Sequence, residues 1–524
     1  MRRIFLSSLV LVGVCGLAIA QEKPPIQQLP VPPVATDFRA PQKPLPELTR
    51  VGVDMNQQRP LALRDALSMA LANNKDIEVA RENVRIAEFD LQGAQGIYDP
   101  RFNMTAFYER AENPISSFLS GGQNGSTIQS DYTGTARLEG QTPVLGGNYR
   151  LDFSSIRLTT NNEFVALNPQ YPTSLSFTYV QPLWRGLKID NSRRQIEIAR
   201  KNLSLTDAQF RQRAIDTITN VQRAYWDLVF ALRSLQVQRD AVTVARTQLE
   251  HNQRLVRQGQ LAPIDVVAAE AQISTYEQGV FSALEEVSRT ENNLKNLIAE
   301  NQRSPLWSES IVPTDSVDLQ VPAISLPDAL QTAMENRPEL QQSTLAKEIN
   351  QIDQRYFKDQ TKPAVDLVGT YGINGLAGSI SSGVNPFTAS NLLVRQRLDE
   401  LSVIAGLDPL PVVPPQTLTP DLLGGYGQSL QNLFANRYNN FRVGVQISLP
   451  FRNRTAEANL GRSLVEGERI ATQREQLEQA IQVDVRNALQ AMRSAEARLR
   501  AASATREANE QQFASEQRKL DAGQ

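Results

Sequence analysis

The residue types that most often carry out chemistry are scarce in this chain. Its 524 residues include one histidine, His251, and one cysteine, Cys15. A single cysteine excludes a disulfide framework and a cysteine-based zinc site, and a single histidine excludes a multi-histidine metal site. The glycine-rich segment at 121–126 lacks the Lys-Ser/Thr ending of a phosphate-binding loop. No paired carboxylates have the spacing of general acid–base catalysis, so the sequence predicts no enzyme, no cofactor and no metal site.

The N-terminal segment has the pattern of a secretory signal peptide. Two arginines precede an apolar stretch at 4–20 that contains Cys15 and ends in Ala-Ile-Ala. We therefore expect residues 1–20 to be a cleaved signal, with a single uncleaved membrane helix as the alternative. Residues 21–60 are rich in proline and predict an extended leader. The net charge of −2 gives no reason to expect a nucleic acid as partner.

The rest of the sequence is internally duplicated. Six residues of one helical pattern recur at a displacement of 263: Leu63, Ala66, Leu67, Ala70, Asn73 and Ile77 match Leu326, Ala329, Leu330, Ala333, Asn336 and Leu340. A second block, beginning at Val221, recurs from Val485 at a displacement of 264. The sequence thus predicts repeat one at 61–300, a linker at 301–323 and repeat two at 324–524.

Each repeat is expected to open with a helix, at 62–96 and at 326–359, the second capped by Ser325. Long heptad patterns then predict a helix at 193–258 and a return helix at 263–299, packed as an antiparallel coiled coil. The first of these would be roughly 100 Å long at about 1.5 Å per residue. The apolar positions of its seam are Val221, Leu228, Leu235 and Val242, with Val280, Val287 and Leu294 across the turn.

Alternation with period two predicts β-strands between the helices. The segments are 102–108, 175–179, 365–373 and 441–449, each with one apolar face. A soluble sandwich would bury such a face in protein, which is the alternative to burial in lipid. Four strands in one chain cannot close a sheet, so strands that span a membrane would have to be shared among several chains.

Two inserts lengthen the β regions. Residues 131–158 have the pattern of an extra hairpin, with Leu145-Gly146-Gly147-Asn148 as its turn. The insert at 376–436 contains an amphipathic stretch, 391–407, followed by several prolines.

These features together resemble the TolC-like outer-membrane efflux protein family. The resemblance rests on the doubled Leu63-x-x-Ala66-Leu67-x-x-Ala70-x-x-Asn73, the strand–helix junctions at 181–186 and 448–451, and Gly259 followed by Asp265-Val266. It implies a mainly α fold with β: an internally duplicated chain whose long coiled-coil hairpins form a periplasmic tunnel. Its strands would contribute to a trimeric, twelve-stranded β-barrel in the cell outer membrane.

The resemblance also implies a function and partners. The chain would be the outer-membrane channel of a tripartite efflux or type I secretion system, a passive homotrimeric conduit. A periplasmic adaptor (a membrane fusion protein) would bind the channel, and an inner-membrane pump would supply the energy. Outer-membrane lipid would surround the strands. The alternative is a secreted or periplasmic coiled-coil adaptor or scaffold. The exported substrate is not specified by the sequence.

The same resemblance nominates two groups of residues. Contacts at the hairpin tips with the adaptor would involve Arg257, Gly259, Asp265, Lys519 and Gly523. Asp265 is interpreted equally well as a first-turn carboxylate that favours the helix dipole.

The junctions between strand and helix would involve Pro182, Trp184, Gly186 and Pro450. Trp184 fits an interfacial aromatic girdle or local core packing. No return helix follows Gly523 as it follows Gly259, so we expect the chain to be truncated at Gln524.

Overall fold

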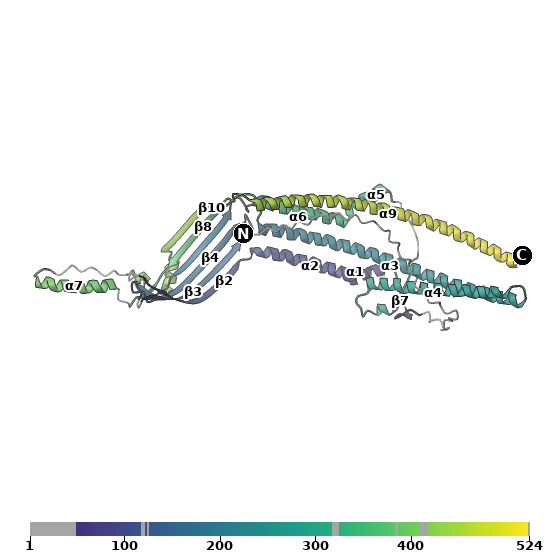
Figure 1. The fold of residues 1–524 in the computed structure, drawn as a ribbon, viewed down its shortest axis with the longest axis horizontal. Helices are drawn as coiled ribbons and strands as arrows, with labels where there is room; N and C mark the ends of the chain where they lie inside the picture. The colour runs from purple at the N-terminus through teal and green to yellow at the C-terminus, as the bar shows by residue number, and fades with distance from the viewer. Residues whose placement is uncertain are drawn as a thin grey trace, which may run out of the picture. The chain divides into compact units, whose positions relative to one another are not determined.

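The computed structural model describes residues 49–116, 121–122, 125–316, 324–382, 386–408 and 418–521. The predicted signal peptide, most of the leader and Gly523 lie outside these residues. Within them, no helix is long and apolar enough to cross a membrane. Figure 1 shows the two kinds of structure that the sequence predicts, long helices and an antiparallel sheet.

The long helical hairpin of repeat one consists of α3 (Asn191–Arg257) and α4 (Pro263–Ile298). Both begin and end within two residues of the predicted bounds. Asp190 caps α3 by accepting a hydrogen bond from the backbone N–H of Arg193, and proline begins α4. The seam is as predicted: the buried side chains include Val221, Leu228, Leu235, Val242, Val280, Val287 and Leu294.

Each opening helix is broken in two, which differs from the single helices that we expected. Repeat one has α1 (Leu63–Asn73) and α2 (Lys75–Gln95), and Asn74 between them is extended, with its side chain accepting from the N–H groups of Asp76 and Ile77. Repeat two has α5 (Leu326–Asn336) and α6 (Pro338–Gln360). Arg337 is extended there because a following proline disfavours the helical conformation. Ser325 caps α5 as predicted.

A single antiparallel sheet joins the two repeats. Its long strands, in spatial order β10-β8-β6-β4-β3-β2, are β2 (Arg101–Pro114), β3 (Ser126–Gln141), β4 (Asn148–Thr160), β6 (Thr173–Pro182), β8 (Ala364–Gly375) and β10 (Tyr438–Ser448). The repeats meet where β6 pairs with β8. The short strands β5 (Leu167–Gln170) and β9 (Gly378–Ile380) pair with each other beside this path.

The prediction of four strands per chain is wrong. The insert at 131–158 does form the predicted hairpin, β3 and β4, but these strands lie inside the sheet between β2 and β6. The described residues therefore place six long strands in one sheet. The hairpin strands pair with the sequence neighbours on either side, β2 and β6, and sequence alternation shows that a strand exists but not which neighbours it has.

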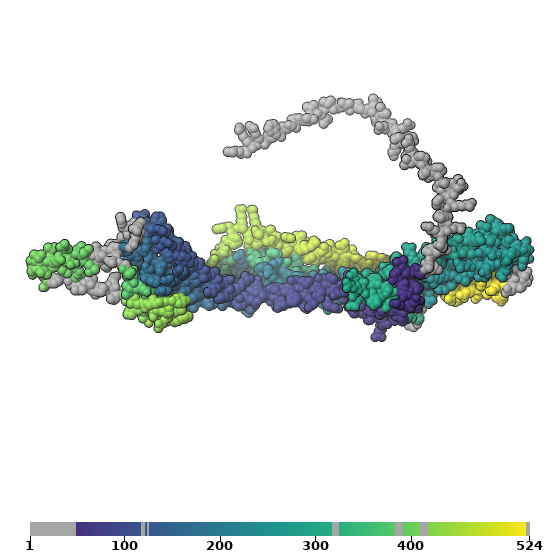
Figure 2. Space-filling model, turned by 90° about the horizontal axis from the view of Figure 1, so that it is seen from below, coloured from purple at the N-terminus to yellow at the C-terminus, as the bar shows by residue number. Residues whose placement is uncertain are grey.

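The helices of the two repeats pack against one another beside the sheet. α3 contacts α2, α4 and α6, and α6 contacts α9 (Arg454–Asp521). Figures 1 and 2 both show these helices running side by side. Repeat two thus contributes α9 where repeat one contributes α3.

Two segments assigned to the leader and the linker instead form regular structure. β1 (Asp54–Leu61) pairs in parallel with β7 (Glu309–Pro313). The extended leader predicted through residue 60 is therefore wrong for its last residues, which hydrogen-bond with a strand about 250 residues away in the sequence. This pair closes one side of the core that α1, α3 and α4 share.

The insert at 376–436 contains two helices, α7 (Pro386–Ile404) and α8 (Tyr426–Phe434). The predicted amphipathic stretch lies mostly in α7, and residues 409–417 lie outside the described residues. α8 packs on β6 and β8. The hydroxyls of Thr173 and Ser429 hydrogen-bond at 2.9 Å, and the side-chain amide of Asn432 donates to the carbonyl of Leu376 at 2.9 Å.

Candidate functional site

One face of the sheet is apolar from edge to edge. The strand register connects two rows of large apolar side chains across the sheet. One row is Phe102, Leu138, Leu151, Phe177, Tyr371 and Phe441. The next is Met104, Ala136, Phe153, Leu175 and Ile373, and it ends at the polar Asn439 on β10. Phe441 is 79% exposed and Met104 is 71% exposed. A continuous exposed apolar face of this kind is typical of contact with lipid, and a soluble sandwich would cover it.

The opposite face of the same strands is polar. Threonine hydroxyls pair across neighbouring strands, as between Thr178 and Thr370 at 3.3 Å. Asp152 on β4 forms ion pairs with Arg137 Nε at 2.6 Å and Arg150 Nε at 2.7 Å. Alternation with period two along every strand thus separates an apolar face from a hydrated one, the arrangement of a membrane channel wall.

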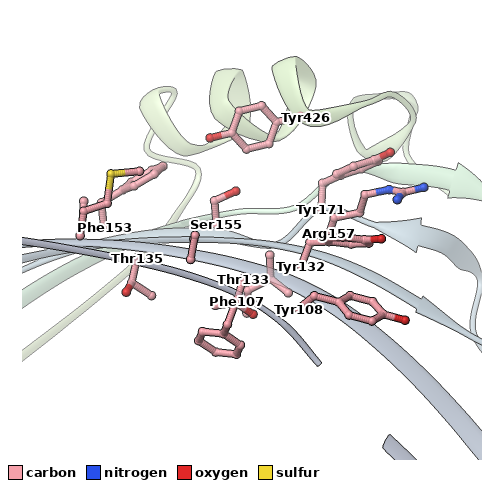
Figure 3. A pocket seen from close by; sticks show the side chains of 15 residues that line it. Phe107, Tyr108, Tyr132, Thr133, Thr135, Phe153, Ser155, Arg157, Tyr171 and Tyr426 are labelled. Carbon is pink, nitrogen blue, oxygen red and sulfur yellow. The ribbon is translucent and has the colours of Figure 1, made fainter. Parts of the chain in front are cut away.

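Tyrosines gather at one end of the apolar face, where a hollow lies in the sheet (Figure 3). The rings of Tyr108 and Tyr132 are 4.7 Å apart between centroids, and the guanidinium of Arg157 lies 5.7 Å from the Tyr132 ring centroid. Tyr426 of α8 lies over this hollow. Amphipathic aromatic side chains of this kind form the girdles of membrane strands at the lipid–water boundary. Sequence reasoning missed this group, although its tyrosines lie at strand positions.

The two predicted strand–helix junctions meet at the start of β8. Pro182 is the last paired residue of β6 and lies opposite Asp366, while Ser448 of β10 lies opposite Ala364 on the other side. Pro450 follows β10 and is exposed. Trp184 is 53% exposed in the single chain.

Gly186 connects the junction to the helices on both sides. Its backbone N–H donates to Asp359 Oδ2 at 2.6 Å, at the end of α6. Its carbonyl accepts from Arg193 Nη2 at 2.5 Å, and Arg193 also pairs with Asp190 at the start of α3. Burial raises the pKa of Tyr98 nearby, and the negative charge of Asp190 adds to the increase. These contacts fix the segment after β6 to the end of α6 and to the start of α3.

The β3–β4 turn is fixed at the same junction. Leu145 and Gly146 both have left-handed backbones, with φ of 62° and 67°, which the twist of a tight hairpin turn favours. The side-chain amide of Gln181 donates to the Leu145 carbonyl at 2.9 Å. A β-carbon on Gly146 would lie 2.7 Å from Asp190 Oδ2, so only glycine fits this close approach to α3.

The α3–α4 turn brings together three of the predicted tip residues. Arg257 is the last residue of α3 and is exposed, and Gly259 follows with φ of 71°, the left-handed conformation that ends many helices. Asp265 lies in the first turn of α4 and is half-buried. Lys519 lies on α9 and pairs with Glu516 of the same helix at 3.0 Å. Gly523 lies outside the described residues.

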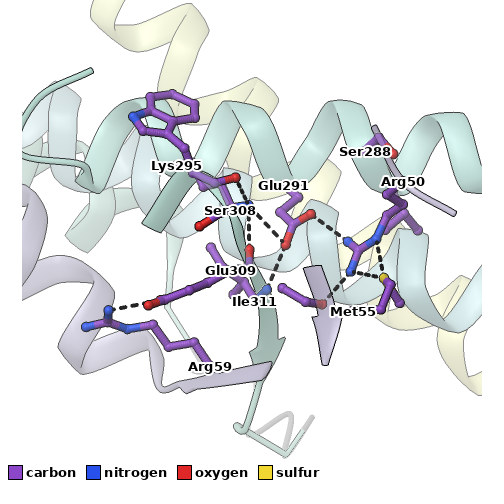
Figure 4. A network of polar contacts seen from close by, with 12 residues as sticks. Arg50, Met55, Arg59, Ser288, Glu291, Lys295, Ser308, Glu309 and Ile311 are labelled. Atoms are coloured by element: carbon purple, nitrogen blue, oxygen red, sulfur yellow. Dashed lines mark hydrogen bonds and ion pairs between the residues drawn. The ribbon is translucent and has the colours of Figure 1, made fainter. Parts of the chain in front are cut away.

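A buried polar network fixes the β1–β7 pair to α4 (Figure 4). Glu291 accepts from Arg50 Nη1 at 2.5 Å and from the backbone N–H of Ile311 at 2.7 Å. Lys295 Nζ donates to the carbonyl of Glu309 at 2.6 Å, and its side chain is fully buried. Burial lowers the pKa of Lys295, while the charge of Glu291 opposes this decrease.

A second polar contact, between the buried Tyr225 and the exposed Asp315, joins α3 to the same region. The hydroxyl of Tyr225 donates to Asp315 Oδ2 at 2.5 Å and lies 3.1 Å from the Leu61 carbonyl. Asp315 also accepts from the backbone N–H of Leu63 at 2.6 Å. The pKa of Asp315 is lowered, first by the Tyr225 hydroxyl and then by the Leu63 N–H. Sequence analysis missed both contacts. The one feature that could have indicated them is the pair Glu291 and Lys295, two charged residues one helical turn apart beside the seam.

The described ranges contain no cluster of metal-binding residues. There, no group of three or more His, Cys, Asp or Glu residues lies in position to hold a metal ion. His251 lies on α3 and is half-buried. The arrangement that the structure does provide is a two-faced sheet continued by long helices.

Comparison with known proteins relates this arrangement to a family. Residues 160–300 match the family model described as outer membrane efflux protein. No curated protein matches the chain.

Among solved structures, CusC, whose crystal structures concern folding and transmembrane channel formation, is 16% identical with a TM-score of 0.51. That likeness covers 88% of this chain and 83% of CusC. VceC from Vibrio cholerae is 14% identical with a TM-score of 0.49, covering 82% of this chain and 79% of VceC. CmeC from Campylobacter jejuni is 14% identical with a TM-score of 0.47, covering 82% of this chain and 71% of CmeC.

The family match and the fold agree with the two-faced sheet and the coiled-coil hairpin. The matching family is one of outer membrane proteins, which agrees with a sheet that has an exposed apolar face. Residues 160–300 of this chain are thus similar to the outer membrane efflux proteins, and its fold is similar to that of CusC.

Proposed function

We propose that the chain is the outer-membrane channel of a tripartite efflux or type I secretion system. The observation that carries this proposal is the sheet, which has an apolar face and a polar face on the same strands. An apolar face suits lipid and a polar face suits a water-filled lumen. The family consists of channels and not of enzymes, which supports the prediction that this chain catalyses no reaction.

The proposed working unit is a homotrimer. β2 and β10 are the two edges of the sheet in the described residues, and each has only one neighbouring strand. An open edge leaves backbone N–H and C=O groups without partners, which is too costly in a lipid bilayer. Copies of the chain that share one closed barrel would satisfy these groups. Trimerisation itself is taken from the resemblance to the family.

The proposed adaptor contact is the α3–α4 turn. Arg257 and Gly259 are exposed there, and Asp265 begins the return helix. Lys519 and Gly523 would contribute the corresponding surface of repeat two. An inner-membrane pump, reached through the adaptor, would supply the energy.

An adaptor or scaffold protein is the competing function. Such a protein accounts for the coiled coil but not for a six-stranded sheet with an exposed apolar face. The pairing of β6 with β8 also joins the strands of two repeats, whereas an adaptor has a single hairpin between halves of a small β domain. We therefore favour the channel.

Cell fractionation tests the channel against the scaffold. The channel should be recovered in the outer-membrane fraction as an SDS-resistant trimer that dissociates on heating. Recovery as a soluble periplasmic monomer would contradict the channel and support the scaffold.

Photo-crosslinking tests the adaptor contact separately. A crosslinking amino acid in place of Arg257 should capture the adaptor in intact cells. The matched control replaces Arg211, which is also exposed and on α3 but lies far along the helix from the turn. Equal capture at both positions, or none at Arg257, would contradict the proposed contact.

A further inference from the structure

The number of strands in each chain determines the size of any closed sheet that its copies form. The described residues contribute six long strands, every neighbouring pair of which is antiparallel. An even number gives the two edge strands opposite directions. β10 of one copy can therefore continue the antiparallel pattern onto β2 of the next, a head-to-tail contact that closes into a ring.

The two edge strands are suited to pair with a second copy. All eleven residues of β10 are exposed, as are all but one of the fourteen residues of β2. Neither strand contains an interior proline or a bulge that would block pairing, since the one proline, Pro114, is the last residue of β2. Each edge strand is therefore suited to hydrogen-bond with the opposite edge strand of another copy of the same chain.

The β3–β4 hairpin is part of the wall and not a loop folded over it. The row of apolar side chains that starts at Phe102 passes through Leu138 and Leu151 before it reaches Phe177. The polar face likewise continues through Arg137 and Asp152. A hairpin outside the membrane would have no reason to carry the same two faces in the same register.

The hairpin strands are also long enough to cross the membrane. β3 has 16 residues and β4 has 13, against the 9–11 residues that a tilted membrane strand requires. Their turn is held at the helix end of the sheet by Gln181 and by Ser192, whose hydroxyl donates to Gln141 at 2.7 Å. The hairpin thus reaches from one end of the sheet to the other.

We propose that three copies close one ring of eighteen strands, in which β2 of each copy hydrogen-bonds with β10 of the next. This inference rests on the trimer of the proposed function and goes beyond it. It replaces the twelve-stranded ring that the resemblance implies, because the β3–β4 hairpin adds two strands to each copy.

The additional strands widen the outer-membrane end of the conduit. With strands about 4.8 Å apart and tilted by about 40°, eighteen strands form a ring about 36 Å in diameter between strand axes, and twelve strands form one of about 24 Å. The cross-section increases about 2.3-fold. Rings of sixteen to eighteen strands leave an aqueous channel, so this end of the conduit admits wider hydrated cargo than a twelve-stranded ring would.

Electron cryomicroscopy of the full-length protein from outer membranes tests the inference. The intact trimer should have eighteen strands and a ring about 36 Å across. The matched variant deletes residues 126–160, which removes β3 and β4 and leaves β2 and β6 antiparallel neighbours. This variant should form a twelve-stranded ring about 24 Å across.

The outcomes separate this inference from the proposed function. A trimer of the intact chain with twelve strands, and with β3 and β4 outside the ring, would overturn the eighteen-stranded ring and leave the channel standing. Absence of an outer-membrane trimer would overturn both. The strand count of the intact chain decides the question even if the deletion variant does not fold.

Discussion

The substitution Glu291→Gln tests the buried network that fixes the β1–β7 pair to α4. Glu291 accepts from Arg50 and from the N–H of Ile311, and it lies 3.6 Å from the buried ammonium of Lys295. Glutamine keeps one carbonyl oxygen, which can serve only one of the two donors, and it turns an NH₂ group toward the other. The change also leaves two buried cations without their shared carboxylate.

The expected cost is large because the whole network is buried. Removing one partner of a buried ion pair costs about 3–5 kcal/mol. If the pair β1–β7 opens as a local unit, that loss makes opening more frequent by roughly 10² to 10³-fold or more, since each 1.4 kcal/mol is a factor of ten. Amide hydrogen exchange at 54–61 and 309–313, followed by mass spectrometry of the purified protein, measures this directly.

Glu286→Gln is the matched control for this experiment. Glu286 is on the same helix and pairs with Arg289 at 2.5 Å, but both side chains are exposed. Exposed ion pairs contribute little to stability, so amide hydrogen exchange of β1 and β7 should not change measurably in the control. Equal exchange of β1 and β7 in the two variants would refute the conclusion that the network holds this pair in place.

The other predictions concern the contact between Tyr225 and Asp315 and the hairpin turn. Tyr225→Phe should lower the free energy of unfolding by about 0.5–1.5 kcal/mol, because the hydrogen bonds of the hydroxyl with the Asp315 carboxylate and the Leu61 carbonyl are lost, and chemical denaturation measures this. The pKa of Asp315 is lowered from 3.8, so its contribution is complete above pH 3.8 and is lost as the pH falls through the lower folded value. Wild type should therefore be more stable than Asp315→Asn at pH 7, with the difference vanishing in strong acid; a difference that does not depend on pH would contradict this assignment. Gly146→Ala should destabilise the β3–β4 turn, because its β-carbon would meet Asp190 and Arg193 and its φ is 67°. Faster amide hydrogen exchange in this turn measures the effect. Gly125→Ala is the control for backbone strain alone, because Gly125 has φ of 80° and open space around it.

The sequence predicted the helical hairpin well for a physical reason. Heptad spacing sustained over α3 and α4 records the packing of two neighbouring segments, and the turn between them is local, at Gly259. The strands were also recognised from their alternation. Their order was not predicted, because alternation does not show whether the hairpin strands pair only with each other or also with the neighbouring strands β2 and β6.

The residues of the candidate site also differ in how well local sequence patterns indicate them. The turn residues Arg257 and Gly259 and the junction residues Pro182 and Gly186 lie next to distinctive local patterns, and the structure places them at a turn and a junction. The Arg50–Glu291 pair joins residues 241 apart in the sequence, and no local pattern could have indicated it. The tyrosine group at the end of the apolar face likewise depends on the register of several strands.

Disulfide crosslinking between the two edge strands tests the central claim most directly, that copies of this chain close one sheet edge to edge. The only cysteine, Cys15, lies in the predicted signal peptide, so introduced cysteines would be the only ones in the mature chain. A cysteine at Ala106 on β2 would be combined in turn with one at Phe441, Val443 or Val445 on β10, all on the apolar face. Ala106 with Phe177, on the interior strand β6, is the control.

Oxidation of intact cells should link at least one edge combination into covalent dimers and trimers and nothing larger, while the control remains monomeric. A series of species that continues beyond trimers, or the absence of crosslinks in all three combinations, would contradict the account.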